Sequence, residues 1–192
     1  MCIRDRYLSV IIKKGKLLIA EPSIIGDVSF NRSIILLTEH NNEGSIGFIL
    51  NKPLDFELGD LIPDVKSNFP IYNGGPVQQD NLYFIHKVAE LVPESIEISK
   101  GLYWSGDFEK VTRLITDEKI NQTEIRFFLG YSGWDINQLQ SELSSNTWIL
   151  SENIYKDNII QTVDTAFWKK KMLALGGEYS LWSNAPEDPS YN

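Results

Sequence analysis

Polar side chains that could move a proton or bind a polar ligand gather between residues 27 and 51 of this chain. They are Asp27, Asn31, Arg32, Glu39, His40 and Asn51. A carboxylate beside a histidine can orient the imidazole and polarise it for proton transfer, which makes Glu39, His40 and Asp27 candidate acid–base residues. A structural interpretation stands beside this one and is favoured: Asp27 and Arg32 would pair to hold a loop, and His40 would end a strand.

A metal site is the second possibility for the same residues. His40, His86, Glu39 and Asp27 include enough nitrogen and oxygen ligands to hold a metal ion. Their spacing fixes no two of them on one element, so only the tertiary structure could assemble them. The single cysteine excludes an internal disulfide and a cysteine-based zinc site. The sequence therefore predicts no metal and no cofactor.

Two glycine-bearing segments are candidates for a turn that binds an anion: Asn-Gly-Gly-Pro at 73–76 and Gly-Tyr-Ser-Gly-Trp at 130–134. Successive N–H groups in such turns can surround an anion, and the second segment precedes a predicted helix. Neither matches a phosphate-loop or dinucleotide pattern. Glycine also lets two backbones approach closely, which is the favoured interpretation for Gly74 and Gly75; for the segment from Gly130 to Trp134 both stay open.

These residues depend on elements that the apolar pattern predicts. The continuous apolar run at 33–38 and the return at 46–50, joined by an Asn/Gly loop, predict an antiparallel hairpin. Further strands are expected at 17–20, 71–72, 82–86, 95–99, 102–104, 123–131 and 147–150, and helices at 56–63, 107–118, 135–146 and 163–175. Strands dominate the first part and helices interrupt the later pairs, which is typical of an α+β fold.

Length and composition limit the function. A chain of 192 residues with 42% hydrophobic residues fits one domain with a sizeable core. We expect that domain over residues 1–183, with 1–14 as an N-terminal segment of undefined structure and 184–192 as a disordered tail. A net charge of −8 opposes nucleic-acid binding. No apolar run approaches the roughly 20 residues of a membrane span, and no secretory signal is evident, so the expected location is the cytoplasm.

Several motifs together resemble one family. LLIAEP, Asp27 and Phe30, RSIILLTEH, GFILNKP, YNGGPV, the strand ending in His86, and FFLGYSGWDINQLQSEL follow one another in the order and spacing of the YqgE/AlgH family. The resemblance covers about residues 15–175 and departs at 135–137, where the family more often has a small or Pro-Gly-like turn. It implies a single bacterial cytoplasmic domain with a largely antiparallel, barrel-like sheet flanked by helices. It implies no established activity.

The sequence thus predicts a binding or regulatory domain that takes an unknown small molecule or protein partner. Its cleft would lie near Asp27, Arg32, Glu39, His40, Asn51, Gly74, Gly75, Gly130 and Trp134. One alternative is an enzyme that uses Glu39, His40 or Asp27 for acid–base chemistry in that cleft. Another, disfavoured by the charge, is a DNA-binding transcriptional regulator. The sequence does not decide whether the protein is catalytic.

Overall fold

The computed structural model describes residues 11–23 and 27–186. Its frame is the predicted hairpin, formed by β2 (Ile34–Asn41) and β3 (Gly44–Ile49). The first five residues of β2 are buried, as a continuous apolar run predicts. His40 pairs with Ser45 and Asn41 with Gly44, so the reversal itself takes only residues 42–43. The turn is tighter than the sequence suggested.

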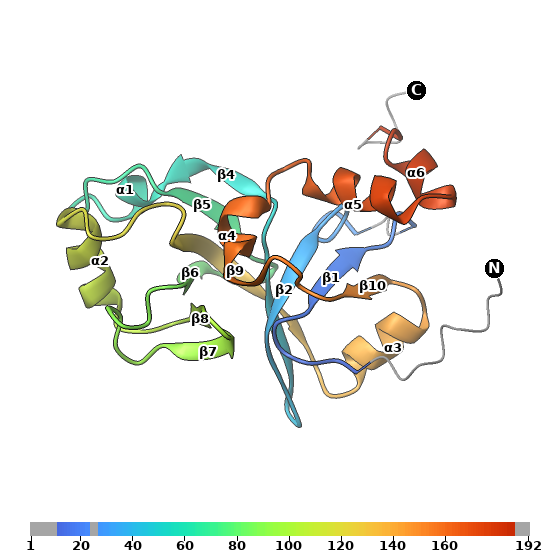
Figure 1. The fold of residues 1–192 in the computed structure, drawn as a ribbon, viewed down its shortest axis with the longest axis horizontal. Helices are drawn as coiled ribbons and strands as arrows, with labels where there is room; N and C mark the ends of the chain where they lie inside the picture. Colours follow the sequence, from blue (N-terminus) through green and yellow to red (C-terminus); the bar gives the residue numbers. More distant parts are fainter. Residues whose placement is uncertain (1–10, 24–26, 187–192) are drawn as a thin grey trace.

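One long strand, β9 (Ile125–Trp134), joins the two halves of the sheet (Figure 1). Residues 125–131 pair with β5 (Pro70–Asn73) or β6 (Val77–His86). Residues 132–134 pair with β3. Gly130 lies at the change of partner with φ +70°, a left-handed conformation that glycine adopts at little cost.

The strand order is β10-β1-β2-β3-β9-β6-β8-β7, and β4 lies off this path, paired with β5. The remaining bounds are β1 (Leu17–Ala20), β4 (Pro53–Glu57), β7 (Ile96–Ser99), β8 (Leu102–Trp104) and β10 (Trp148–Ser151). Each pairing is antiparallel except that of β5 with β9. The α+β class with a largely antiparallel sheet is confirmed. The sheet is open, so the barrel-like description holds only loosely.

Helices flank both ends of this sheet (Figure 1). α1 (Leu58–Leu61) and α2 (Phe108–Thr116) lie at one end, near β4 to β8, and α3 (Gln138–Ser144) lies at the other, near β1 and β10. The chain then forms a 3-10 turn, η2 (Lys156–Asn158), and helices α4 (Ile159–Thr162), α5 (Phe167–Leu175) and α6 (Glu178–Trp182). No helix in the described part of the chain is long and apolar enough to cross a membrane.

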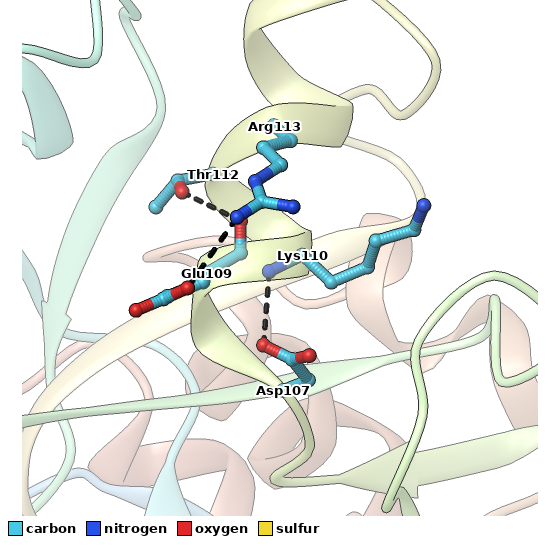
Figure 2. Close-up of polar contacts among 5 residues, drawn as sticks. All are labelled: Asp107, Glu109, Lys110, Thr112 and Arg113. Carbon is cyan, nitrogen blue, oxygen red and sulfur yellow. Dashed lines mark hydrogen bonds and ion pairs between the residues drawn. The ribbon is translucent and has the colours of Figure 1, made fainter.

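The start of α2 shows how local sequence fixes a helix here. The Asp107 carboxylate accepts a hydrogen bond from the Lys110 N–H at 3.0 Å and so caps the helix (Figure 2). Glu109 and Arg113, four residues apart on the exposed face, lie 3.5 Å from each other. The opposite face is buried through Val111, Leu114 and Ile115, as the helical spacing predicted.

The core side chains form three clusters, which determine where the helices pack. One surrounds Phe48 and Phe128 and includes the buried face of α5. A second surrounds Phe127 and includes α2. A third holds Trp134 and Trp148 against Leu139 of α3. Helix α3 is therefore held to the sheet largely by aromatic side chains.

Three predicted elements are corrected by the structure. Residues 130–134, predicted as a turn before a helix, continue strand β9, because their backbone pairs with β6 and then β3. Strand β4 was missed, since its alternating pattern PLDFE carries two acidic residues. The helix predicted over 163–175 begins at Phe167, and a further helix, α6, follows it before the expected tail. The expectations for 1–10 and 187–192 lie outside the described residues.

Candidate functional site

The two glycine segments meet, and they meet backbone to backbone. A Cβ atom on Gly74 would lie 2.2 Å from the Gly130 carbonyl oxygen, and one on Gly75 would lie 2.3 Å from the Tyr131 carbonyl. Gly74, Gly75 and Gly130 are all buried. The contact fits the interpretation in which glycine permits close approach of two chain segments.

The polar groups of this junction already have protein partners. The Gly74 N–H donates to the Leu129 carbonyl at 2.9 Å, and the Gly75 N–H donates to the Asn73 side chain at 3.1 Å. The buried Ser132 hydroxyl donates to the Gly74 carbonyl at 3.1 Å. Anion binding needs N–H groups that point at the ligand. These bonds and the close backbone approach join the two halves of the sheet, and whether the junction also binds an anion stays a prediction.

Asp27 and Asn51 both hold the loop that leads into β2. The Asp27 carboxylate accepts from the N–H of Ser29 at 2.9 Å. The buried Asn51 side chain accepts from the Ile34 N–H at 2.9 Å and donates to the Arg32 carbonyl at 2.9 Å. Such side chain to backbone bonds are how Asx residues fix turns.

The Arg32 side chain turns toward the C-terminal segment. Its guanidinium donates to the carbonyls of Ala185 and Pro186 at 2.6 and 3.0 Å, and it lies 5.1 Å from the centroid of the Trp168 ring. The contacts described for Arg32 are with the C-terminal segment and those for Asp27 are with its own loop, so the pairing of Asp27 with Arg32 stays a prediction. Whether either residue binds a ligand stays a prediction.

The acid–base residues are not assembled into one group. Glu39 and His40 are neighbours on β2, so their side chains point to opposite faces of the sheet. Among residues 11–23 and 27–186, no three His, Cys, Asp or Glu side chains gather as metal ligands would.

His86 is a structural histidine. Its ring is fully buried; Nε2 lies 3.1 Å from the Ser105 carbonyl oxygen and 3.1 Å from the Ser95 hydroxyl, while Nδ1 accepts from the Val88 N–H at 3.3 Å. Loss of hydration lowers its pKa, against smaller opposing effects of the Ser105 hydrogen bond and the Glu90 charge. Both ring nitrogens have hydrogen-bond partners, and the ring has no exposed surface at which a substrate could bind.

Trp134 belongs to an aromatic cluster that fastens α3. Its ring stacks on Phe30 with centroids 6.3 Å apart and meets Trp148 edge to face at 6.0 Å. The indole N–H groups of Trp134 and Trp148 both donate to one Glu142 oxygen, at 2.9 and 2.7 Å. Glu142 of α3 is therefore bound to the sheet through two charge-assisted hydrogen bonds.

A surface hollow of about 450 Å³ lies beside the tip of the β2–β3 hairpin. One wall is the hairpin, and the other is the chain leading into α3, which the aromatic cluster holds in place. Residues 11–12 complete it. Its lining consists of Ile11, Ile12, His40, Asn41, Asn42, Gly44, Ser45, Asp135, Ile136, Asn137, Leu139 and Gln140.

Within this hollow, His40 and Ser45 form a pair. They stand opposite each other on β2 and β3, and the imidazole Nδ1 lies 2.8 Å from the Ser45 hydroxyl oxygen. The Asn41 side-chain oxygen accepts from the Glu43 N–H at 2.8 Å and so holds the hairpin turn. The chain here places mainly polar side chains around a concave surface.

Of the residues predicted for the site, the structure puts His40 in this hollow and the others elsewhere. The sequence reasoning did not select Ser45, Asp135, Asn137 or Gln140. Ser45 could have been found from the sequence by placing a two-residue turn at 42–43, because that register pairs Ser45 with His40 across the hairpin. The departure from the family pattern at 135–137 was the only sequence sign of the opposite wall.

Comparisons with known proteins give one consistent result. A family model described as AlgH-like matches residues 17–180. The chain is 42% identical over 189 residues to a UPF0301 protein of Bacteroides thetaiotaomicron, covering 96% of this chain and 93% of the relative. It is 38% identical to a UPF0301 protein of Chlorobaculum tepidum, covering 95% and 97%.

Two solved structures share the fold. The solution structure of the AlgH protein from Pseudomonas aeruginosa superposes with a TM-score of 0.67 at 27% identity, covering 90% of this chain and 93% of that one. A crystal structure of a protein from Corynebacterium diphtheriae gives a TM-score of 0.70 at 21% identity, covering 96% and 100%. The second likeness concerns the fold alone.

Proposed function

The chain belongs to the AlgH-like family, and we propose that it serves there as a binding domain. The site is the hollow beside the hairpin tip, and the ligand is a small polar molecule of neutral or positive charge. The observation that supports this is the hollow itself, which is lined by residues from three separate parts of the sequence. The names of the relatives state no substrate and no reaction.

The size and lining of the hollow indicate the ligand class. A volume of about 450 Å³ is in the range of small-molecule sites. Its polar side chains are amides, a hydroxyl and an imidazole, and Asp135 is the carboxylate among them. No Lys or Arg stands among the lining residues that the structure describes, so an anion would meet a negative charge without compensation. Ile12 and Leu139 add an apolar surface for a carbon skeleton.

A regulatory role and a cytoplasmic location remain parts of the proposal. The net charge of −8 weighs against direct binding to DNA, since such binding depends on neutralising phosphates. A domain that responds to a metabolite and passes that state to a protein partner is compatible with the charge and the fold.

A thermal-shift screen of small polar metabolites tests the proposal. A compound that binds only the native state, present at a concentration about 100 times its dissociation constant, raises the free energy of unfolding by about 2.7 kcal/mol. The variant Gln140→Trp places an indole over the hollow from the exposed side of α3. Its matched control is Ser141→Trp, which is also exposed on α3 but does not line the hollow. We expect the control to keep the shift and Gln140→Trp to lose it.

Two results would contradict the proposal. One is a metabolite that stabilises Gln140→Trp as strongly as the wild type. The other is a set of hits confined to anions, which the charge of Asp135 should exclude. Melting temperatures of both variants without ligand establish that the added indole has not disturbed the fold.

A further inference from the structure

We propose that Ser45 is a nucleophile activated by His40 and that the hollow accepts the acyl group of a small ester onto the Ser45 hydroxyl. The inference rests on the proposed function, because the substrate must first enter the hollow. It adds a chemical step for which the binding role alone has no need.

The geometry carries this proposal. A hydroxyl becomes a useful nucleophile when a base within about 2.6–3.2 Å can take its proton. The His40 Nδ1 lies 2.8 Å from the Ser45 oxygen, and both residues line the hollow. His40 is exposed while Ser45 is only 5% exposed, so the hydroxyl is reached through the hollow and not from open solvent.

The surroundings of the pair are polar. Asp135, Asn137 and Gln140 line the same hollow, so an ester that enters it meets polar side chains.

Acylation and hydrolysis return the Ser45–His40 pair to its starting state. The Ser45 oxygen attacks the carbonyl carbon of the ester, and its proton passes to the His40 Nδ1. The bond from that carbon to the leaving oxygen breaks, and the leaving alkoxide takes the proton from the imidazolium. The products are acyl-Ser45 and an alcohol. Water can then attack the acyl carbon, give its proton to His40, and release the acid while the Ser45 oxygen regains its proton.

The experiment uses the full chain and 4-nitrophenyl acetate. We expect a burst of one nitrophenolate per chain and an acetyl group on the peptide that contains Ser45, read by mass spectrometry. Ser45→Ala abolishes the burst, and His40→Gln slows it by about 100-fold or more, the usual share of a general base. Ser141→Ala, a serine outside the hollow, keeps it.

If mass spectrometry of the wild type finds the acetyl group on His40 or on lysines and none on Ser45, the inference is overturned. The rates of the variants do not change that conclusion. The inference also fails if His40→Gln acylates Ser45 at the wild-type rate. If Gln140→Trp still blocks metabolite binding in that case, the binding role stands without the chemical step. If Gln140→Trp leaves metabolite binding intact, the binding role itself has failed.

Discussion

Arg126 carries a positive charge into the interior, where no carboxylate of the described residues meets it. Its guanidinium donates to the carbonyls of Leu50 at 2.7 Å, of Val163 at 3.1 Å and of Ile160, and it lies 4.3 Å from the Tyr72 ring centroid. Burial lowers its pKa from the usual value, and the Tyr72 hydroxyl opposes this in part. The planar guanidinium has five N–H donors in a fixed arrangement, against three on an ammonium, and so can reach carbonyls in several directions at once.

The variant Arg126→Met should therefore be strongly destabilised. It leaves three buried carbonyl oxygens without donors, and each unsatisfied group costs about 1–3 kcal/mol, so we expect a loss of at least about 3 kcal/mol in the free energy of unfolding. Urea denaturation measures it, and Arg126→Lys should recover only a part. Arg113→Met on the exposed face of α2 is the control, expected within about 0.5 kcal/mol of wild type. An equal loss in both variants would contradict the role given to Arg126.

The buried His86 predicts a pH dependence of stability. Its folded pKa is lowered, chiefly by desolvation, while in the unfolded chain it titrates at its ordinary value. As the pH falls below that ordinary value of about 6.5, His86 takes up a proton in the unfolded chain but not in the native state. The free energy of unfolding therefore decreases, by up to about 1.4 kcal/mol per pH unit. Above that value the contribution is fully present.

The urea concentration at the midpoint of unfolding, measured at several pH values between about 7.5 and 5.5, tests this prediction. We expect wild type to lose stability with a steeper slope than His86→Gln over the same range. Because both proteins share His40 and the carboxylates, the difference in slope belongs to His86. Parallel slopes would mean that the folded His86 titrates as it does in the unfolded chain.

At the scale of elements, the two hydrogen bonds of Glu142 hold α3 against the sheet, and α3 forms part of one wall of the hollow. Glu142→Ala leaves the indole N–H groups of Trp134 and Trp148 unpartnered, at a cost of about 1–3 kcal/mol for each buried donor. We expect a lower melting temperature together with weaker metabolite stabilisation, because Leu139 and Gln140 of α3 line the hollow. A variant that loses stability but binds a metabolite as tightly as wild type would show that α3 does not shape the site.

The elements predicted well from the sequence are those whose apolar residues alone define the buried surface. The β2 run and the buried face of α2 needed only apolar periodicity. The predicted strand ended too early because Gly130 and Gly133 are usual signals of a turn. In the structure β9 continues through both, and Gly130 takes its positive φ close to where the strand changes partners. That requirement comes from the approach of residues 74–75, which no local pattern records.

The candidate site was predictable only in part, for a related reason. His40 stood out because a histidine beside a carboxylate is a visible pair, yet the side chain that it contacts is that of Ser45 across the hairpin, and Glu39 points to the other face of the sheet. Cross-strand neighbours depend on register, and register depends on a turn that is two residues long. The wall at 135–137 comes from the far end of β9, so its position follows from the whole sheet.

For the whole molecule, the junction of residues 74–75 with β9 should be the least tolerant point. In Gly74→Ala, a Cβ would lie 2.2 Å from a backbone oxygen that belongs to the central strand. We expect a loss of at least about 3 kcal/mol, since the clash is with backbone that cannot rotate away. Gly177→Ala has positive φ but open space around its Cβ, and should cost about 1 kcal/mol. Similar melting temperatures for the two variants would contradict a close-packed junction.

The most direct measurement is a map of backbone amide chemical shifts on adding the strongest metabolite from the thermal-shift screen to the ¹⁵N-labelled chain. Changes should concentrate at the hairpin tip and the start of α3, at Asn41, Asn42, Ser45 and Asn137, and should be lost in Gln140→Trp. Changes centred instead on Arg32 or Gly75, with the hairpin tip unmoved, would show that the ligand binds elsewhere and that the hollow is not the site.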